Sequence, residues 1–456
     1  MNTRETLALL REYESRNVLF MDPDGSWPIV WERAKGVHVW DADGKKYLDL
    51  TAAFGVAAAG HANPRVVKAG QEQMEKLTHA MGDVHPHARK AELARELSRI
   101  TFERWSAEFG RALENSKPET RNPKLQTGKT IFCNSGFEAV EVALKTAMLT
   151  AGKYGVIAFQ GGYHGLGYGT LNVTHRDFFR GQFRLQLKEF GHFVQFPTKA
   201  SDLPVVETLM RRHFQRGWVG AVLVEPVQAR GGINVPPPEF LPLLRRLCDE
   251  HKALLVADEI YTGFGRTGKW FACEHSGVVP DIICLGKALT GGFPLSACVG
   301  RADVMDAAWP ASRGEAIHTS TFLGNPVGCA MALAQINEID EGKLPERAAK
   351  LGEFLMSELS KLHPPSLGSG ATSSPKSNVT ARGLGLMAGL DFRLANGAPD
   401  GATAMRVIKA MLRLGFILLP EGEHGNVVSF TPPLTISKAQ LAETIAALAK
   451  VLNEAV

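Results

Sequence analysis

The stretch DIICLGKALTGGFPLSACVG, residues 281–300, indicates the architecture of the chain most clearly. Its apolar run, residues 282–285, predicts a short buried strand that is followed by a single lysine, Lys287, and a glycine-rich turn. Upstream, the stretch ALLVADEIYTGFGRTG, residues 253–268, predicts a second buried strand, which ends near Asp258. The sequence therefore places an amine and a carboxylate at the ends of two strands.

Buried strands alternate with helical patterns from residue 130 onward. The apolar, strand-like runs are TIFCN (130–134), YGVIAF (154–159), VGAVLVEPV (219–227), ALLVADE (253–259) and DIICLG (281–286). This alternation predicts an α/β fold with a mainly parallel central sheet that is covered on both faces. Ligands of such sheets bind at the carboxyl ends of the strands. The polar residues at these ends are Asn134, Glu225, Asp258 and Lys287.

The two ends of the chain follow other patterns. The stretch GVHVWDADGKKYLDL, residues 36–50, has the alternation and the Asp-Gly turn of a β-hairpin, and a helix is expected from about Asn63. Two polar stretches contain proline, and most of residues 108–128 and the stretch 365–378 are interpreted as loops. Strand-like runs then return as ARGLGLMAGLDF, GFILLP and NVVSFTPPL, before a helical C-terminus.

Composition excludes several classes of protein. The 456 residues suggest about two domains, and the net charge of +4 is not gathered into a basic run, so no nucleic-acid partner is expected. No apolar run approaches the length of a membrane span, and the N-terminus lacks a secretory core. The six cysteines form no CxxC pair, which favours reduced thiols. We therefore expect a cytoplasmic protein with no membrane partner.

A lysine and an acid in this arrangement suit pyridoxal phosphate (PLP). The Lys287 amine can form a Schiff base with the cofactor aldehyde, and the Asp258 carboxylate can keep the pyridine nitrogen protonated, so that the ring accepts electrons. Taken alone, a lysine after an apolar run is more often a surface residue in a loop. The surrounding motifs favour the cofactor.

Those motifs extend from DGKKYLDL (43–50) to TPPLTIS (431–437) and are densest at DEIYTGFGRTG, LGKALTGGFPLSA, FCNSGFEAVEVALK and STFLGNP. In this order and at these separations, the chain resembles the class III (omega) aminotransferases, within fold type I of the PLP enzymes. The resemblance implies a large PLP-binding domain, residues 63–328, and a smaller α+β domain built from both termini, residues 1–62 and 329–456. It also implies a homodimer with shared active sites.

The resemblance assigns cofactor contacts to particular residues. Ser135 and Gly136 match the pair that binds the phosphate at a helix start, where N–H groups and the helix dipole favour an anion. The plain alternative is an ordinary cap, with Glu138 completing a capping box. Tyr163 matches the aromatic residue that stacks on the pyridine ring. His164, beside it, either lines the site or satisfies a backbone carbonyl.

Further assignments follow from the same match. Asp258 is the partner of the pyridinium nitrogen, and Tyr261 stands where many members carry a glutamine that contacts the ring hydroxyl. Thr321 matches a threonine that reaches the phosphate of the adjacent subunit, although Leu323 replaces a usual glycine nearby. Arg266, in the stretch GFGRTG, is expected to tie down neighbouring segments. No set of metal ligands is predicted.

The candidate substrate contacts depart from the members that use 2-oxoglutarate or ornithine. Leu166 and Ser429 stand where those members carry arginines, and Arg230 stands where they carry a glutamate. Arg230 either offers a new anion handle or points to solvent. Because an arginine–carboxylate fork makes strong, directional contacts, the missing arginines argue against recognition of a second carboxylate. Phe54 is the fourth candidate substrate contact.

We therefore expect a PLP-dependent transaminase with a ping-pong cycle. Its donors are small-molecule amines or amino acids, its acceptors are oxo acids or aldehydes, and pyruvate is favoured over 2-oxoglutarate. An aminomutase of the glutamate-1-semialdehyde type, an amino acid epimerase or a decarboxylase would share the same cofactor residues. A non-catalytic PLP-binding module with a regulatory role is also conceivable, but intact Lys287 and Asp258 argue against it.

Overall fold

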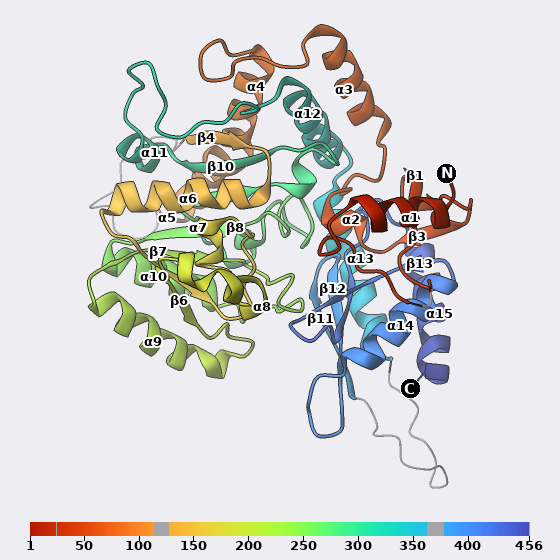
Figure 1. Ribbon diagram of the computed structural model, residues 1–456. Coiled ribbons are helices and arrows are strands. Elements are labelled where there is room, and N and C mark those ends of the chain that lie inside the picture. The colour runs from red at the N-terminus through yellow and green to blue at the C-terminus, as the bar shows by residue number, and fades with distance from the viewer. Residues whose placement is uncertain (24, 114–126, 363–377, 456) are drawn as a thin grey trace.

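A computed structural model of the chain describes residues 1–23, 25–113, 127–362 and 378–455 (Figure 1). Its largest sheet has seven strands in the order β4-β10-β9-β8-β7-β5-β6. These strands are β4 (Gly128–Cys133), β5 (Gly155–Phe159), β6 (Gly191–Val194), β7 (Val219–Val224), β8 (Leu254–Asp258), β9 (Ile282–Leu285) and β10 (Ser296–Arg301). Only β10 is antiparallel to its neighbours, β4 and β9. The predicted α/β fold with a mainly parallel sheet is therefore confirmed.

Both faces of this sheet are buried, because alternate residues of each strand enter different cores. In β8, Leu255 packs in the core that includes α9 (Leu203–Gln215) and α10 (Phe240–His251), whereas Val256 packs in the core that includes α6 (Gly136–Ala151). The residues of β9 alternate in the same way. A strand covered on both faces has a continuous apolar sequence, which is why the apolar runs predict these strands.

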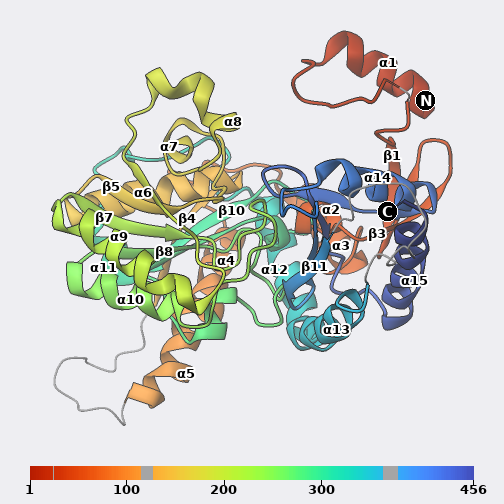
Figure 2. The same cartoon turned by 90° about the horizontal axis from the view of Figure 1, so that it is seen from below.

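The remaining helices surround this sheet or lie with the two ends of the chain. They are α1 (Thr3–Tyr13), α2 (Ala52–Gly55), α3 (Pro64–Lys76), α4 (Ala88–Ser98), α5 (Arg104–Leu113), α7 (Tyr168–Leu171), α8 (Asp177–Arg180), α11 (Ala302–Ala308), α12 (Pro326–Glu341), α13 (Leu344–Leu359), α14 (Gly401–Arg413) and α15 (Lys438–Ala455). The helix expected from Asn63 is α3, and the Asn63 side chain caps it. Helix α1 has no buried residue, and Figure 2 shows it standing apart from the rest of the chain.

The loop predicted for most of residues 108–128 does not include the two ends of this stretch. Helix α5 continues to Leu113, since no proline interrupts the sequence before Pro118, and β4 begins at Gly128, which pairs with Arg301. Residues 114–126 lie outside the described part of the chain. The same holds for the second predicted loop up to residue 377.

The two ends of the chain meet in a smaller sheet. Strands β1 (Trp31–Lys35), β2 (His38–Asp41) and β3 (Lys46–Asp49) are antiparallel, as the predicted hairpin requires, and β13 (Phe416–Ile417) pairs in parallel with β3. A third sheet has the order β11-β12-β15-β14. Its strands are β11 (Asn378–Leu384), β12 (Met387–Arg393), β14 (Leu419–Glu421) and β15 (Val427–Phe430). The β3–β13 pairing supports the proposal that both termini build one small domain.

Two further expectations concern the environment of the protein. All six cysteines are buried and free, which agrees with the predicted reduced thiols. Among the helices of the described ranges, none combines the length and the apolar character that crossing a membrane requires.

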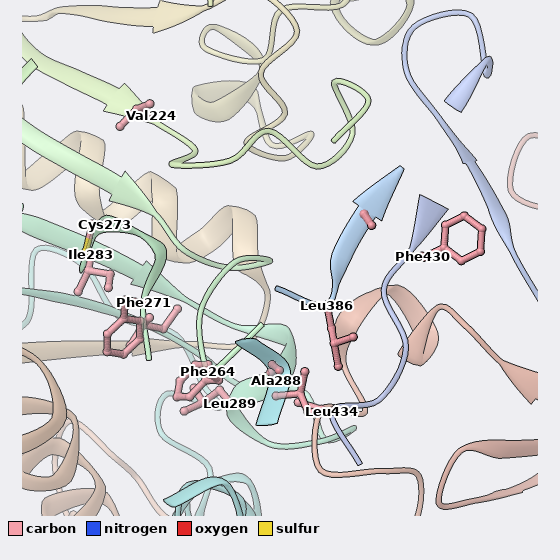
Figure 3. Packing of buried hydrophobic residues seen from close by; sticks show 14 of the residues in the cluster. Val224, Phe264, Phe271, Cys273, Ile283, Ala288, Leu289, Leu386, Phe430 and Leu434 are labelled. Carbon is pink, nitrogen blue, oxygen red and sulfur yellow. The ribbon is translucent and has the colours of Figure 1, made fainter. Parts of the chain in front are cut away.

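One hydrophobic core connects the central sheet to the third sheet, β11-β12-β15-β14. Figure 3 shows Ile283 of β9, and Ala288 and Leu289 beyond it, in the same cluster as Leu386 and Phe430. The backbone on either side of Lys287 is thus held by packed side chains, which limits how far this lysine can move.

Arg266 strengthens the same connection. It is buried, and its Nη1 donates hydrogen bonds to the carbonyl oxygens of Leu386 (3.1 Å) and Pro432 (2.5 Å). Burial lowers the pKa of Arg266 to about 10, so the side chain stays charged at neutral pH. The expectation that Arg266 ties down neighbouring segments is confirmed.

Gly385, in the turn between β11 and β12, offers a test of this packing. Its φ is +58°, and a Cβ there would lie 2.3 Å from the carbonyl carbon of Thr267. We expect Gly385→Ala to lower the free energy of unfolding by about 2–5 kcal/mol, because left-handed strain and overpacking add. Gly397→Ala is the matched control, since its φ is +83° but nothing lies within 4 Å. Scanning calorimetry should show the larger loss for Gly385→Ala; equal losses would contradict the packing argument.

Candidate active site

The carboxyl ends of neighbouring strands bring the predicted polar residues together. Glu225 follows β7, Asp258 ends β8, and Lys287 lies two residues beyond β9, and these three strands are adjacent in the sheet. A cavity of about 380 Å³ opens at this edge. The predicted site residues that line it are Gly136, Tyr163, His164, Leu166, Arg230, Asp258, Tyr261 and Lys287.

Lys287 begins a short 3-10 turn and has a φ of +41°. A positive φ is uncommon for a residue with a side chain, and its surroundings must hold it in place. Its Nζ lies 4.5 Å from the centre of the Tyr261 ring. Burial lowers the pKa of Lys287, against the opposing effect of the Asp258 charge. A lowered pKa increases the fraction of neutral amine, which is the nucleophilic form.

His164 is tied to Asp258. Its Nδ1 lies 2.7 Å from Oδ2 of Asp258, both side chains are buried, and the backbone N–H of Ile260 donates to the other carboxylate oxygen at 3.2 Å. The choice left open for His164 is therefore resolved, because it lines the cavity and holds a carboxylate instead of a backbone carbonyl. Two contacts on one carboxylate fix the direction in which it faces the cavity.

Tyr163 is positioned through its backbone. Its N–H donates to Oε1 of Glu225 at 2.9 Å, and the N–H of Ala229 donates to Oε2 at 3.1 Å. Burial raises the pKa of Glu225 to about 6. The Tyr163 ring meets Phe179 edge to face, at 5.4 Å between centroids. Glu225 thus links the two loops that carry Tyr163 and Arg230.

The start of α6 fits the phosphate of PLP. The Glu138 carboxylate accepts hydrogen bonds from the N–H groups of Asn134 (2.7 Å) and Ser135 (2.8 Å), as expected for the acidic half of a capping box. The Ser135 hydroxyl makes no side-chain cap bond, and its Oγ is buried without a hydrogen-bond partner. A buried, unpaired hydroxyl at a helix N-terminus is suited to an anion.

The hydroxyl group of Tyr261 contacts a threonine of the C-terminal part of the chain. Its Oη lies 3.2 Å from Oγ1 of Thr431, which in turn donates to the carbonyl of Thr51 at 3.2 Å. Burial raises the pKa of Tyr261 to about 12, so the phenol stays protonated. The ring forms part of the cavity wall beneath Lys287.

Four predicted residues are not part of this cavity's lining: Ser135, at the start of α6, and Thr321, Ser429 and Phe54. Thr321 is exposed in the segment before α12. Ser429 is buried in β15, and its Oγ donates to the carbonyl of Leu419 at 3.0 Å. Phe54 lies in the α2 turn and lines a separate apolar pocket with Trp27 and other residues. The structure thus brings neither Ser429 nor Phe54 into the cavity beside Lys287.

Arg230 lines the cavity, and its side chain is 35% exposed. Its guanidinium lies 5.8 Å from the centre of the Tyr163 ring. Two charged neighbours of Arg230 are absent from the sequence-based candidates. Glu421 lies 3.6 Å from the Arg230 guanidinium, and Arg176 donates to the Arg230 carbonyl. No sequence motif marks Glu421 or Arg176, because strand pairing and the folding of the loops place them near Arg230.

Comparisons with known proteins agree with this geometry. The family described as Aminotransferase class-III matches residues 20–452. The 5-aminovalerate aminotransferase DavT of Pseudomonas aeruginosa is 35% identical over 439 residues, which cover 94% of each chain. The putrescine aminotransferase of Pectobacterium atrosepticum is 34% identical, over 99% of this chain and 89% of its own.

Comparison with solved structures also identifies aminotransferases. The ornithine aminotransferase of Toxoplasma gondii matches with a TM-score of 0.80 and 27% identity, over 99% of this chain and 95% of its own. An amine transaminase from an uncultivated Pseudomonas species, in its PLP-bound form, matches with a TM-score of 0.81 and 26% identity, over 98% and 99% of the two chains. The chain therefore belongs to the class III aminotransferases, which are PLP-dependent enzymes of fold type I.

Proposed function

We propose that this aminotransferase moves an amino group from a primary amine or amino acid to a monocarboxylic oxo acid such as pyruvate, in preference to 2-oxoglutarate. The observation that carries the proposal is the charge of the cavity wall. Among the described residues that line the cavity, Arg230 is the only arginine, and Leu166 is apolar. One guanidinium supports recognition of one carboxylate. A second carboxylate would meet an environment that leaves its charge unpaired.

The relatives support an aliphatic amine as the donor. 5-Aminovalerate and putrescine, which appear in their names, both carry a primary amine at the end of an unbranched chain. These names also favour transamination over the aminomutase, epimerase and decarboxylase alternatives. The donor and the acceptor would bind in turn to one cavity, in a ping-pong cycle.

The residues at the strand ends are assigned separate tasks in this cycle. When bound, PLP supplies an aldehyde for the amino group and a ring that accepts electrons. The Lys287 amine binds the aldehyde between turnovers and moves the proton at the reacting carbon of the substrate. Asp258, oriented by His164, stabilises a positive charge at the ring nitrogen. Ser135 and the first N–H groups of α6 bind the phosphate.

A homodimer with shared sites is part of the proposal. Thr321 supports it, because this residue is exposed and lies outside the lining of its own cavity. Ile317 and Phe322, in the same segment, are 70% and 56% exposed, which is typical of a surface that another chain covers. We also propose a cytoplasmic location, which the reduced, buried cysteines support.

Attachment of PLP to Lys287 can be tested directly. Purified protein should be yellow, and borohydride should fix the cofactor irreversibly to one peptide. Mass spectrometry is expected to place the label on Lys287 and not on Lys269, the other lysine of residues 253–300. A label elsewhere, or none, would contradict the assignment.

Asp258 is expected to act through its charge. Asp258→Asn preserves the shape of the side chain and removes the charge, so kcat should fall by about a hundredfold or more. Steady-state rates are compared at saturating PLP, with the cofactor content per subunit measured in both proteins. Near-normal turnover at full cofactor content would rule out the proposed role.

The acceptor preference follows from the single arginine. We expect kcat/KM for pyruvate to exceed that for 2-oxoglutarate by at least about tenfold, since an unpaired charge in a partly buried site costs more than 1.4 kcal/mol. Arg230→Ala should weaken pyruvate and 2-oxoglutarate alike, because both would lose the same carboxylate partner. A wild-type preference for 2-oxoglutarate would refute the proposed acceptor, and its persistence in Arg230→Ala would show that Arg230 is not its cause.

A further inference from the structure

The ring of Tyr261 presents one face to Lys287. The Lys287 Nζ lies 4.5 Å from the centre of this ring, within the distance at which an aromatic face attracts an ammonium group. Tyr261 comes three residues after Asp258, the end of β8, and it is buried in the lining of the cavity. An acid and an aromatic ring near Lys287 therefore come from one strand end.

The hydroxyl group of Tyr261 is committed to a different contact. Its Oη lies 3.2 Å from Oγ1 of Thr431, and because Thr431 donates its own hydroxyl proton to the carbonyl of Thr51, the phenol is the donor to Thr431. Burial raises the pKa of Tyr261 to about 12, so the phenol is neutral and places no negative charge beside the amine. What Tyr261 offers Lys287 is therefore the electron-rich face of its ring.

Close packing holds the ring in this position. Gly55 has a φ of +79°, and a Cβ there would lie 2.9 Å from Cε1 of Tyr261, so a glycine lets the α2 turn approach the ring this closely. The ring also packs with apolar residues from the loop after β7 and from the third sheet, which are Val227, Ala229, Ile233, Met387 and Val427. A ring packed in this way stays in place while the lysine moves.

In the proposed function, Lys287 exists for part of each cycle as a free ammonium group. The amine is released when a substrate amine takes its place, and it then carries the proton that it takes from the reacting carbon of the substrate. A cation in a buried site is unfavourable unless a neighbour stabilises it. The carboxylates at the nearest strand ends already have partners, since Asp258 contacts His164 and Glu225 accepts two backbone N–H groups.

We propose that Tyr261 is a positioning residue for Lys287: the face of its ring receives the amine whenever the lysine is not bonded to the cofactor, and it stabilises the ammonium form. The inference rests on the proposed function, in which Lys287 binds the aldehyde between turnovers and moves a proton. That proton is taken from the substrate carbon and later returned, so the step needs no further reactant. An aromatic face suits this task because it attracts the cation without accepting its proton.

Charged groups of the cavity also act on Lys287. Burial lowers the pKa of this lysine. Three acids at strand ends oppose burial and raise the pKa, namely Asp258, Glu225 and Glu421, whereas Arg230 lowers it further. The aromatic ring acts in the same direction as the acids, because it favours the ammonium form. Removing the ring while keeping these charges should therefore lower the pKa of the lysine and increase the neutral fraction of its amine at a given pH.

The test measures the protonation of Lys287 without turnover. The protein is loaded with pyridoxamine phosphate, the amino form of the cofactor, which has no aldehyde and leaves Lys287 free. A trace of acetic anhydride, which reacts with neutral amines, is added across a range of pH, and mass spectrometry gives the labelling rate of Lys287 at each pH. The midpoint of this profile reports the protonation of the amine, whereas its plateau at high pH reports the access of the reagent.

Tyr261→Leu should move the midpoint to lower pH, so that below the midpoint the labelling rate, as a fraction of its plateau, rises by about fivefold or more. Tyr261→Phe is the matched control, because it removes the hydroxyl group and keeps the ring face, and its rate should stay within about twofold of the wild type. Thr431→Val, which removes only the partner of the hydroxyl group, should behave like Tyr261→Phe. If Tyr261→Leu fails to fold, Tyr261→Gln should show the same shift, since it also lacks the ring.

Three results would overturn the inference. They are an unchanged midpoint in the folded variant that lacks the ring, an equal shift in Tyr261→Phe, or a shift in Thr431→Val. The measurement involves neither an amino donor nor an acceptor. If borohydride fixes the cofactor to another lysine, the proposed function itself fails. If it labels Lys287 and the midpoint does not move, only the role of Tyr261 fails.

Discussion

The burial of β8 and β9 on both faces is the constraint on which the rest of the structure depends. Leu255 and Val256 point to opposite cores, and so do Ile282 and Ile283, so neither strand can shift by one residue without moving its side chains to the wrong face. The ends of these strands are consequently set in register. An acid and a lysine at those ends can face one cavity only because the apolar residues before them have no alternative pairing.

Sequence reasoning works well where this constraint acts and less well beyond it. Strands and their polar ends are predictable because an apolar run with two buried faces has few other interpretations. The pairing of His164 with Asp258 is not predictable in this way, since these residues are 94 positions apart and their contact depends on the conformation of a glycine-rich loop. Glu421 shows the same limit. It reaches Arg230 because β14 pairs with β15, and no local pattern encodes which residue of so short a strand lies beside Arg230.

The buried carboxylates near Lys287 each have a partner of their own. Asp258 has a histidine, Glu225 has two backbone N–H groups, and Glu421 has guanidinium groups as neighbours. Each acid is thus occupied by a different kind of partner, although all three lie near one lysine amine. That separation allows burial to lower the pKa of Lys287 instead of a strong ion pair raising it.

The parallel pairing of β3 with β13 has a consequence for how the protein is made. The Lys45 side chain donates to the carbonyl of Arg413, across 368 residues of sequence, at the same place where the two strands meet. At about 5–20 residues per second, a ribosome needs roughly 20–70 s to synthesise the intervening chain. During this time one edge of the N-terminal hairpin has no partner and can pair with other chains. The first sheet to be synthesised is therefore among the last to be completed, and the nascent protein depends on protection of that edge until its C-terminal strands emerge.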